Sequence, residues 1–166
     1  MQVEPGGLAR SLQRVPLGDR GVSEDALQDL LDQHPELLPA RDIDPALGPL
    51  ISLGREIVTS VGQIDNLFVT PSGQLVVVEA KLWKNPEARR EVVGQIIDYA
   101  SALSMLTVDE LDGLVAQSDD SRRGIWARAL TSPFSSQVPE ESSFRDALRR
   151  NLKQGRFLLL VVGDSI

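Results

Sequence analysis

A turn signal between two apolar runs constrains the fold of this chain more than any other feature. Thr70-Pro71-Ser72-Gly73 combines a proline, which presets its own φ, with a glycine, which adopts positive φ without strain. The flanking runs, 63–69 and 74–82, have strand length, and the second contains Leu75-Val76-Val77-Val78. Two such runs joined by a four-residue turn predict an antiparallel β-hairpin. A sheet therefore lies at the centre of the predicted fold.

The elements around the hairpin follow from the spacing of apolar residues. Ser23 is a typical N-cap, and Asn85-Pro86-Glu87 is a typical helix start. The helix after the hairpin carries one long apolar stripe, made of Ala88, Val92, Val93, Ile96, Ile97, Ala100 and Leu103. The full pattern predicts a loop over 40–50, strands over 55–61 and 156–162, and helices over 23–34, 85–103, 107–117, 122–131 and 141–153. This order of elements indicates an α/β domain with a mixed central sheet flanked by helices.

The chain of 166 residues has the length of one domain. We expect residues 1–22 to form an N-terminal arm and residues 23–166 to form the folded domain, with a helical insert at about 106–153. The chain stops shortly after the strand 156–162, where an α/β domain normally adds a covering helix. We therefore expect the C-terminus to be truncated.

Composition excludes several classes of site. The chain has no cysteine and one histidine, His34, which excludes disulfides, Cys-zinc sites, thiol nucleophiles and multi-His metal sites. No apolar run approaches the ~18–20 residues that a membrane span requires. The N-terminus lacks the apolar core of a signal peptide. A cytoplasmic location without a membrane partner is therefore predicted.

The charge is acidic overall but unevenly distributed. A net charge of −7 argues against a nucleic-acid partner, because proteins that neutralise many phosphates are usually basic. Residues 21–70 carry nine acids and two bases, whereas residues 122–166 carry eight bases and four acids. This division permits a metal site beside a phosphate-binding surface, and it equally permits an ordinary dipolar surface.

Charged side chains interrupt the hairpin strands near their open end. Glu79 and Lys81 share one face of their strand, because alternate residues point the same way. With the turn at 70–73, Asp65 comes opposite residues 78–80. Two carboxylates and a main-chain carbonyl are oxygen ligands that Mg²⁺ or Mn²⁺ prefers, and a lysine can stabilise charge on a phosphoryl group. The pattern predicts a site for metal-dependent phosphodiester hydrolysis.

These residues carry a family resemblance. Ile64-Asp65 followed by Val78-Glu79-Ala80-Lys81 resembles the PD-(D/E)XK signature of the restriction-endonuclease-like nuclease superfamily. Gln95-x-x-x-Tyr99 on the next helix resembles the QxxxY motif of its RecB-like exonuclease branch. The predicted order αβββαβ matches the superfamily's core. The chain departs from the signature at Ile64, which stands where the motif has proline, and in its acidic net charge.

The resemblance implies a role for each hairpin residue. Asp65 and Glu79 would be metal ligands for Mg²⁺ or Mn²⁺, with the Ala80 carbonyl as a third ligand. Lys81 would be the catalytic lysine. Glu24 would be the acid that many members place on the first helix, where it joins the metal ligands and the catalytic set.

The resemblance also implies contacts with nucleic acid. Gln95, counted among the catalytic residues, and Tyr99 would position Lys81 or contact DNA. Independently of the resemblance, the flanking Lys84, Arg89 and Arg90 either bind phosphate or pair with Glu87 and Glu91 on a solvated helix face. The implied activity is hydrolysis of DNA phosphodiester bonds, in DNA repair or in defence against foreign DNA. A homodimer is one option, because many nucleases of this fold dimerise. DNA or RNA, single or double strand, and exonuclease or endonuclease all stay open.

Each of these roles has an ordinary structural alternative. Glu79 and Lys81 would also form an exposed ion pair on a sheet face. Glu24 would also serve as a first-turn acid favoured by the helix dipole. Gln95 and Tyr99 would also be plain helix contacts. A basic cluster on the last predicted helix either follows a nucleic-acid backbone or complements the helix C-terminus; its members are Arg145, Arg149, Arg150 and Lys153.

Two further functions compete with the nuclease. The first is a catalytically inactive domain of the same fold, retained as a nucleic-acid or protein interaction module. The acidic net charge favours it, and the complete set of Asp65, Glu79 and Lys81 disfavours it. The second is a structural domain of a larger protein.

Overall fold

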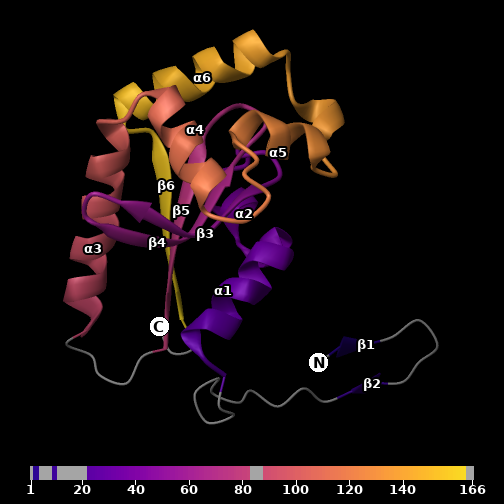
Figure 1. Cartoon of the computed structure of the whole chain (residues 1–166). Helices are drawn as coiled ribbons and strands as arrows, with labels where there is room; N and C mark the ends of the chain where they lie inside the picture. Colours follow the sequence, from indigo (N-terminus) through magenta and orange to yellow (C-terminus); the bar gives the residue numbers. More distant parts are fainter. Residues whose placement is uncertain (1, 4–8, 11–21, 83–87, 164–166) are drawn as a thin grey trace.

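The computed structural model shows an α/β architecture in which helices flank a four-stranded mixed sheet (Figure 1). It describes residues 2–3, 9–10, 22–82 and 88–163. The strands of the sheet are β3 (Ile51–Thr59), β4 (Gly62–Val69), β5 (Leu75–Lys81) and β6 (Phe157–Gly163). The helices are α1 (Glu24–Gln33), α2 (Ala40–Ile43), α3 (Ala88–Ser104), α4 (Val108–Gln117), α5 (Ile125–Thr131) and α6 (Glu141–Gln154). No helix in the described ranges is long and apolar enough to cross a membrane.

A separate two-stranded sheet pairs β1 (Gln2–Val3) with β2 (Ala9–Arg10). These short strands belong to the segment 1–22 that was predicted to be an arm. Apart from them and residue 22, that segment lies outside the described residues.

The central sheet has the strand order β3-β4-β5-β6. β3, β4 and β5 pair antiparallel, whereas β5 and β6 pair parallel across the connection that contains α3 to α6. The predicted hairpin is confirmed: Val69 pairs with Leu75, and the Gly73 N–H donates to the Thr70 carbonyl at 2.9 Å to close the turn. The sheet is therefore mixed, as predicted.

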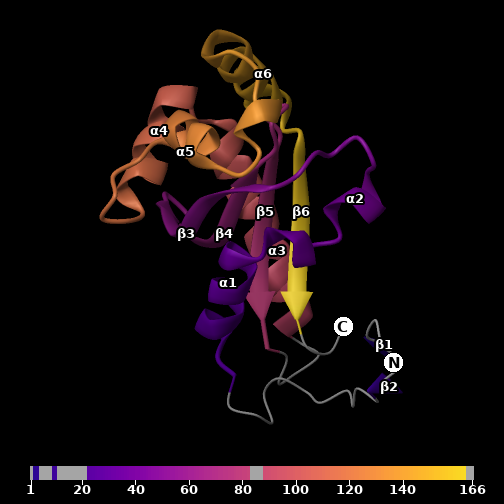
Figure 2. The ribbon, with the colours of Figure 1, turned by 90° about the vertical axis from the view of Figure 1, so that its right-hand side faces the viewer.

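Two apolar cores lie on opposite faces of the sheet (Figure 2). Leu27 and Leu31 of α1 pack on one face against Phe68, Val76 and Val78. The other face packs against α3 and against all three helices of the region 106–153, through residues that include Ile96, Leu103, Leu111, Ile125, Phe144 and Leu148. The predicted helical insert thus shares one continuous core with the sheet.

The first strand of the sheet differs from its prediction. The alternation predicted a strand over 55–61, but β3 runs from Ile51 to Thr59. A bulge between Ser52 and Gly54 shifts the register, and Gly54 has φ +121°, a conformation that glycine adopts without a Cβ penalty. Ile51, Leu53 and Ile57 belong to one core, but Gly54 and the charged Arg55 interrupt the apolar residues between them, so the sequence pattern placed the start of the strand too late.

The apolar stripe of α3 is narrower than predicted. Val92, Ile96 and Leu103 are buried, as expected, but Val93 is 51 % exposed and Ile97 is 54 % exposed. Adjacent positions on a helix are about 100° apart, and the packed face of α3 includes Val92 and Ile96 but leaves Val93 and Ile97 outside it. Tyr99 takes the remaining place on the buried face.

Two other predictions of secondary structure were also wrong. The segment 40–50, predicted as a loop, contains the one-turn helix α2, whose first residue Ala40 is buried. The helix predicted over 122–131 begins at Ile125, because Gly124 provides the extended N-cap and Arg122 has positive φ. Both segments are too short for the apolar period to place their ends.

We expect Gly73→Ala to destabilise the protein strongly. Gly73 has φ +73°, and a Cβ there would lie 2.7 Å from the main-chain nitrogen of Leu148 on α6. The left-handed conformation and the backbone clash together cost about 2–4 kcal/mol. The matched control is Gly94→Ala in α3, where a Cβ meets nothing within 4 Å and gains about 0.5–1 kcal/mol of helix stability. Urea unfolding checks both, and equal midpoints for the two variants would contradict this packing.

Candidate active site

Four charged side chains meet where the β4–β5 hairpin opens. Asp65 comes from β4, Glu79 and Lys81 come from the end of β5, and Glu24 comes from the first turn of α1. We call these four residues the acid–lysine cluster. α1 lies beside this end of β5 (Figure 2). Three separate elements therefore converge on one point.

Asp65 occupies the place that the hairpin register predicts. The β4–β5 pairing runs from Val69 and Leu75 to Asn66 and Val78, so the next residue, Asp65, falls beside Glu79. The main-chain pairing stops there. The Asp65 side chain continues the contact between the strands, because the Ala80 N–H donates to Asp65 Oδ2 at 2.8 Å. The predicted proximity of Asp65 to residues 78–80 is confirmed.

Glu24 joins the cluster by holding Lys81. Lys81 Nζ donates to Glu24 Oε2 at 3.2 Å, and the Leu82 N–H donates to Glu24 Oε1 at 3.1 Å. Glu24 is therefore more than a first-turn acid that complements the helix dipole. Because both of its oxygens already accept hydrogen bonds, its role as a metal ligand stays a prediction.

Glu79 is the most buried member of the cluster. Its side chain is 1 % exposed, Oε1 lies 3.9 Å from Lys81 Nζ, and Oε2 has no hydrogen-bond partner. The alternative of an exposed Glu79–Lys81 ion pair is therefore wrong. Burial raises the pKa of Glu79 to about 7, with further contributions from the negative charges of Asp65 and Glu24, while Lys81 opposes the rise.

The same surroundings shift the pKa values of Asp65 and Lys81. Burial raises the pKa of Asp65, although the Ala80 N–H and the charge of Lys81 counteract part of the rise. Burial alone would lower the pKa of Lys81, but the hydrogen bond that Lys81 donates to Glu24 and the neighbouring carboxylates outweigh it and raise this pKa. Lys81 is therefore a cation at neutral pH, beside one carboxylate that exchanges a proton near pH 7.

The candidate QxxxY pair lies on α3. Gln95 Nε2 donates to the Tyr99 hydroxyl at 2.7 Å. Tyr99 is 2 % exposed, and burial raises its pKa, while the hydrogen bond from Gln95 lowers it and the negative charges of Glu79 and Asp65 add to the rise. The prediction that Tyr99 contacts DNA is not supported by this burial. The burial of Tyr99 is compatible with a role in positioning the acid–lysine cluster.

The predicted phosphate-binding residues are only partly described. Lys84 and the side chain of Arg89 lie outside the described residues. Arg90 is exposed in the first turn of α3. In the basic cluster of α6, Arg145 pairs with Asp109 and Arg149 pairs with Asp146, so half of its charge is already compensated by acids.

The acid–lysine cluster is chemically suited to one divalent cation. In the described part of the chain, no three or more Asp, Glu, His or Cys side chains form a group that could hold a metal ion by themselves. Mg²⁺, however, often binds through one or two carboxylates and keeps several waters until a phosphate arrives. Asp65 and Glu79 provide that pair, and Glu79 Oε2 is an acceptor without a partner. A ligand role for the Ala80 carbonyl stays a prediction.

The sequence patterns missed three polar residues beside the cluster. Gln28, Arg55 and Asn66 lie between α1 and the sheet, where Arg55 Nη2 donates to Gln28 Oε1 and Asn66 Nδ2 donates to the Gln28 carbonyl. Asn66 carried a usable signal, because a second polar residue directly after Asp65 interrupts an otherwise apolar strand. Gln28 carried none, since glutamine is common on exposed helix faces.

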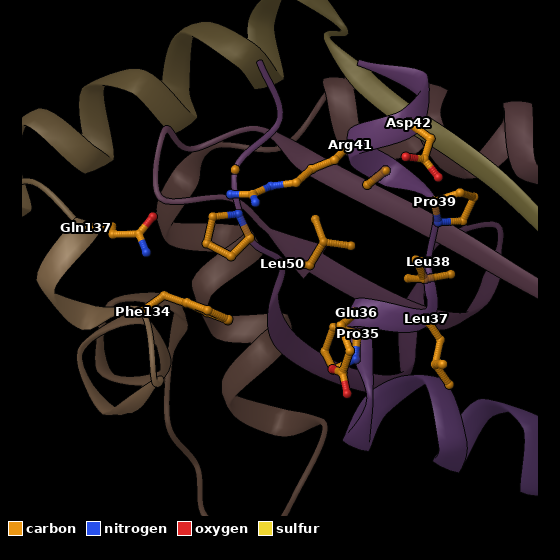
Figure 3. A pocket seen from close by; sticks show the side chains of 13 residues that line it. Pro35, Glu36, Leu37, Leu38, Pro39, Arg41, Asp42, Leu50, Phe134 and Gln137 are labelled. Carbon is orange, nitrogen blue, oxygen red and sulfur yellow. The ribbon is translucent and has the colours of Figure 1, made fainter. Parts of the chain in front are cut away.

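A cavity of about 510 Å³ lies apart from the acid–lysine cluster (Figure 3). Leu37, Leu38 and Pro39 line one side, and Phe134 and Gln137 line the other. None of the cluster residues lines it. Its wall is largely apolar and proline-rich, with Glu36, Arg41 and Asp42 as its charged residues.

Comparison of the chain with known protein families, with curated proteins and with solved structures gives no significant match. The resemblance to the restriction-endonuclease-like superfamily therefore stays a prediction. The residues of the acid–lysine cluster are the remaining guide to the function of the chain.

Proposed function

We propose that this chain is a metal-dependent nuclease with a restriction-endonuclease-like core that hydrolyses DNA phosphodiester bonds. The order α1, β3, β4, β5, α3, β6 fits the αβββαβ core that the resemblance implies. Asp65, Glu79 and Lys81, which carry the PD-(D/E)XK resemblance, lie together at the open end of the hairpin. Mg²⁺ or Mn²⁺ is the proposed cofactor.

One observation carries the proposal. Glu79 is buried beside a second carboxylate, and one of its oxygens has no hydrogen-bond partner. A buried, unpaired carboxylate oxygen costs stability and is rare in folded proteins, so it calls for an explanation. A divalent cation is the simplest one, because it would satisfy that oxygen and offset the repulsion between Glu79 and Asp65.

The residues of the cluster have separate proposed tasks. Asp65 and Glu79 would hold the metal, which supplies Lewis-acid activation of the phosphoryl group and of water. Lys81 remains protonated at neutral pH and can donate a hydrogen bond to a phosphoryl oxygen as negative charge develops on it. Glu24 holds the Lys81 ammonium group, while Gln95 and Tyr99, which are hydrogen-bonded to each other, would act as positioning residues.

A cleavage assay tests this function. Linear and circular DNA, single- and double-stranded, are incubated with the protein in Mg²⁺, in Mn²⁺ and in EDTA. We expect products only with metal, and none from Asp65→Asn or Glu79→Gln. Glu56→Gln, which makes the same change at an exposed position of the same sheet, should cleave like the wild type. Cleavage in EDTA, or equal cleavage by Glu79→Gln, would refute the proposal.

An inactive interaction module of the same fold is the second candidate. It is favoured by the lack of a three-acid metal group in the described residues and by the net charge of −7. Under this alternative, the protein binds DNA in a salt-dependent manner without cleaving it in any metal, or binds no DNA at all.

A further inference from the structure

A buried polar cluster joins α1 to the sheet next to the candidate active site. It consists of Gln28, Arg55 and Asn66, and we call it the polar clamp. Arg55 Nη2 donates to Gln28 Oε1 at 3.3 Å, and Asn66 Nδ2 donates to the main-chain carbonyl of Gln28 at 3.0 Å. Gln28 is 7 % exposed and Asn66 is fully buried. Arg55 and Asn66 are register partners on β3 and β4, so two strands together hold one residue of α1.

Arg55 fixes the orientation of the Gln28 amide. Ion pairs with Asp25 and Asp29 hold the guanidinium against α1. Because a guanidinium has donors only, the amide must present its oxygen to Arg55 and direct its NH₂ group elsewhere. Asp65 lies close to this amide: burial is the main influence on the Asp65 pKa and raises it, whereas the Gln28 side chain lowers it.

The clamp also fixes the position of Glu24. Glu24 precedes Gln28 by four residues on α1, so the two side chains lie on the same helix face, one turn apart. Glu24 reaches Lys81 Nζ and the Leu82 N–H from that turn. A rotation or a shift of α1 by a fraction of a turn would break both hydrogen bonds.

The clamp retains polar groups where apolar packing would be simpler. Two of its buried atoms, Arg55 Nε and Asn66 Oδ1, have no hydrogen-bond partner. Such groups reduce stability, yet a directional network specifies one arrangement of two elements in a way that apolar contacts do not. A need for one exact placement of α1 explains why polar residues stand here.

We propose that Gln28, held by Arg55 and Asn66, is a positioning residue that keeps Glu24 and Asp65 in place around Lys81. Its effect on catalysis rests on the function proposed above, whereas its effect on the placement of the two carboxylates does not.

Hydrogen exchange of two amides tests the placement directly. The Leu82 N–H donates to Glu24 and the Ala80 N–H donates to Asp65, so each amide reports on one carboxylate. In Gln28→Met we expect both amides to exchange at least about tenfold faster, the loss expected for hydrogen bonds to charged groups. The Val77 amide in the middle of β5 should keep its wild-type rate. Gln33→Met, the same change at an exposed position of α1, should leave all three rates unchanged.

A conservative variant separates the two contacts of the amide. Gln28→Glu keeps an oxygen for Arg55, and it adds a charge that repels the neighbouring Asp65 carboxylate. We therefore expect wild-type protection of the Leu82 amide and faster exchange of the Ala80 amide. This variant also tests the proposal if Gln28→Met fails to fold. Wild-type rates at both amides in a folded Gln28→Met, or at Ala80 in Gln28→Glu, would overturn the proposal.

Metal binding and kinetics test the catalytic consequence. Loss of a residue that orients metal ligands typically weakens metal affinity by about 10–100-fold, so we expect that loss of Mn²⁺ affinity in Gln28→Met, with lower kcat and little change in KM. If the wild type neither binds Mn²⁺ nor cleaves DNA, the proposed function fails while the exchange rates still decide the role of Gln28. If the wild type is active and Gln28→Met matches it in kcat, affinity and exchange, only the role of Gln28 is refuted.

Discussion

Replacing Glu79 with glutamine raises the stability of the metal-free protein at pH 8. Glu79 is buried beside Asp65 and has an oxygen without a partner, so its charge destabilises the folded state. The amide has a similar shape and no charge. We expect a gain of about 2 kcal/mol after the cost of burying an amide is deducted, which corresponds to about 4–8 °C in Tm. Thermal melts in EDTA measure the gain, with Glu56→Gln as the exposed control.

The gain depends on pH in a defined direction. The pKa of Glu79 is raised to about 7 in the folded state, so between about pH 4.5 and pH 7 the folded protein keeps a proton that the unfolded chain has released. Stability of the wild type therefore falls as pH rises through this window and levels off above it. Glu79→Gln lacks this component, so the two melting curves should converge near pH 5. An equal difference in Tm at pH 5 and pH 8 would contradict the burial of a titrating carboxylate.

Divalent metal should make the wild type more stable than Glu79→Gln. At about 100 times its Kd, a ligand adds about 2.7 kcal/mol to the stability of the folded state. We expect Mn²⁺ to raise the Tm of the wild type and to leave that of Glu79→Gln unchanged. A rise of equal size in both proteins would place the metal elsewhere.

Replacing Lys81 with methionine should have the largest effect on activity. Methionine keeps much of the length and apolar surface of lysine but removes the donor that stabilises a developing negative charge. Removal of one such donor typically lowers kcat by about 10²–10³-fold, and we expect a loss of that size in DNA cleavage. Arg41→Met, which removes a cation at an exposed position of α2, is the control and should cleave normally. A loss of less than tenfold would show that Lys81 does not act at the reacting phosphate.

Lys81→Met should lower the stability of the metal-free protein, whereas Glu79→Gln should raise it. Without Lys81, Glu24, Asp65 and Glu79 lose their shared cation, and we expect the metal-free protein to lose about 1–2 kcal/mol at pH 8. Mn²⁺ restores positive charge, so the rise in Tm on metal addition should be larger in Lys81→Met than in the wild type. An equal rise in Tm in the two proteins would show that Lys81 does not lie at the metal site.

Local rules were sufficient to predict the hairpin and the part of the site that it carries. Pro71 and Gly73 set the turn, the turn sets the register, and the register brings Asp65 to Glu79. Each step depends on residues close in sequence, which is why it could be read without a structure. The start of β3 could not, because Gly54 and Arg55 interrupt the apolar residues of this strand.

Contacts between distant elements could not be derived in the same way. Glu24 was proposed from the resemblance, but its hydrogen bonds to Lys81 and Leu82 require the packing of α1 on the sheet. Gln28 was missed because nothing in a helical pattern distinguishes a buried glutamine from an exposed one. The raised pKa of Glu79 also depends on burial, which is a property of the whole fold.

Calorimetric titration of the protein with Mn²⁺ tests most directly whether Asp65 and Glu79 form a divalent-metal site. Metal binding displaces protons from its ligands, and with a pKa of about 7 Glu79 is largely protonated at pH 6.5. Titrations in two buffers of different ionisation enthalpy should give a release of roughly 0.5–1 proton per metal at pH 6.5 and close to none at pH 8.5. Glu79→Gln should bind no Mn²⁺ at either pH. Absence of binding in the wild type, or binding by Glu79→Gln with wild-type affinity, would contradict the account.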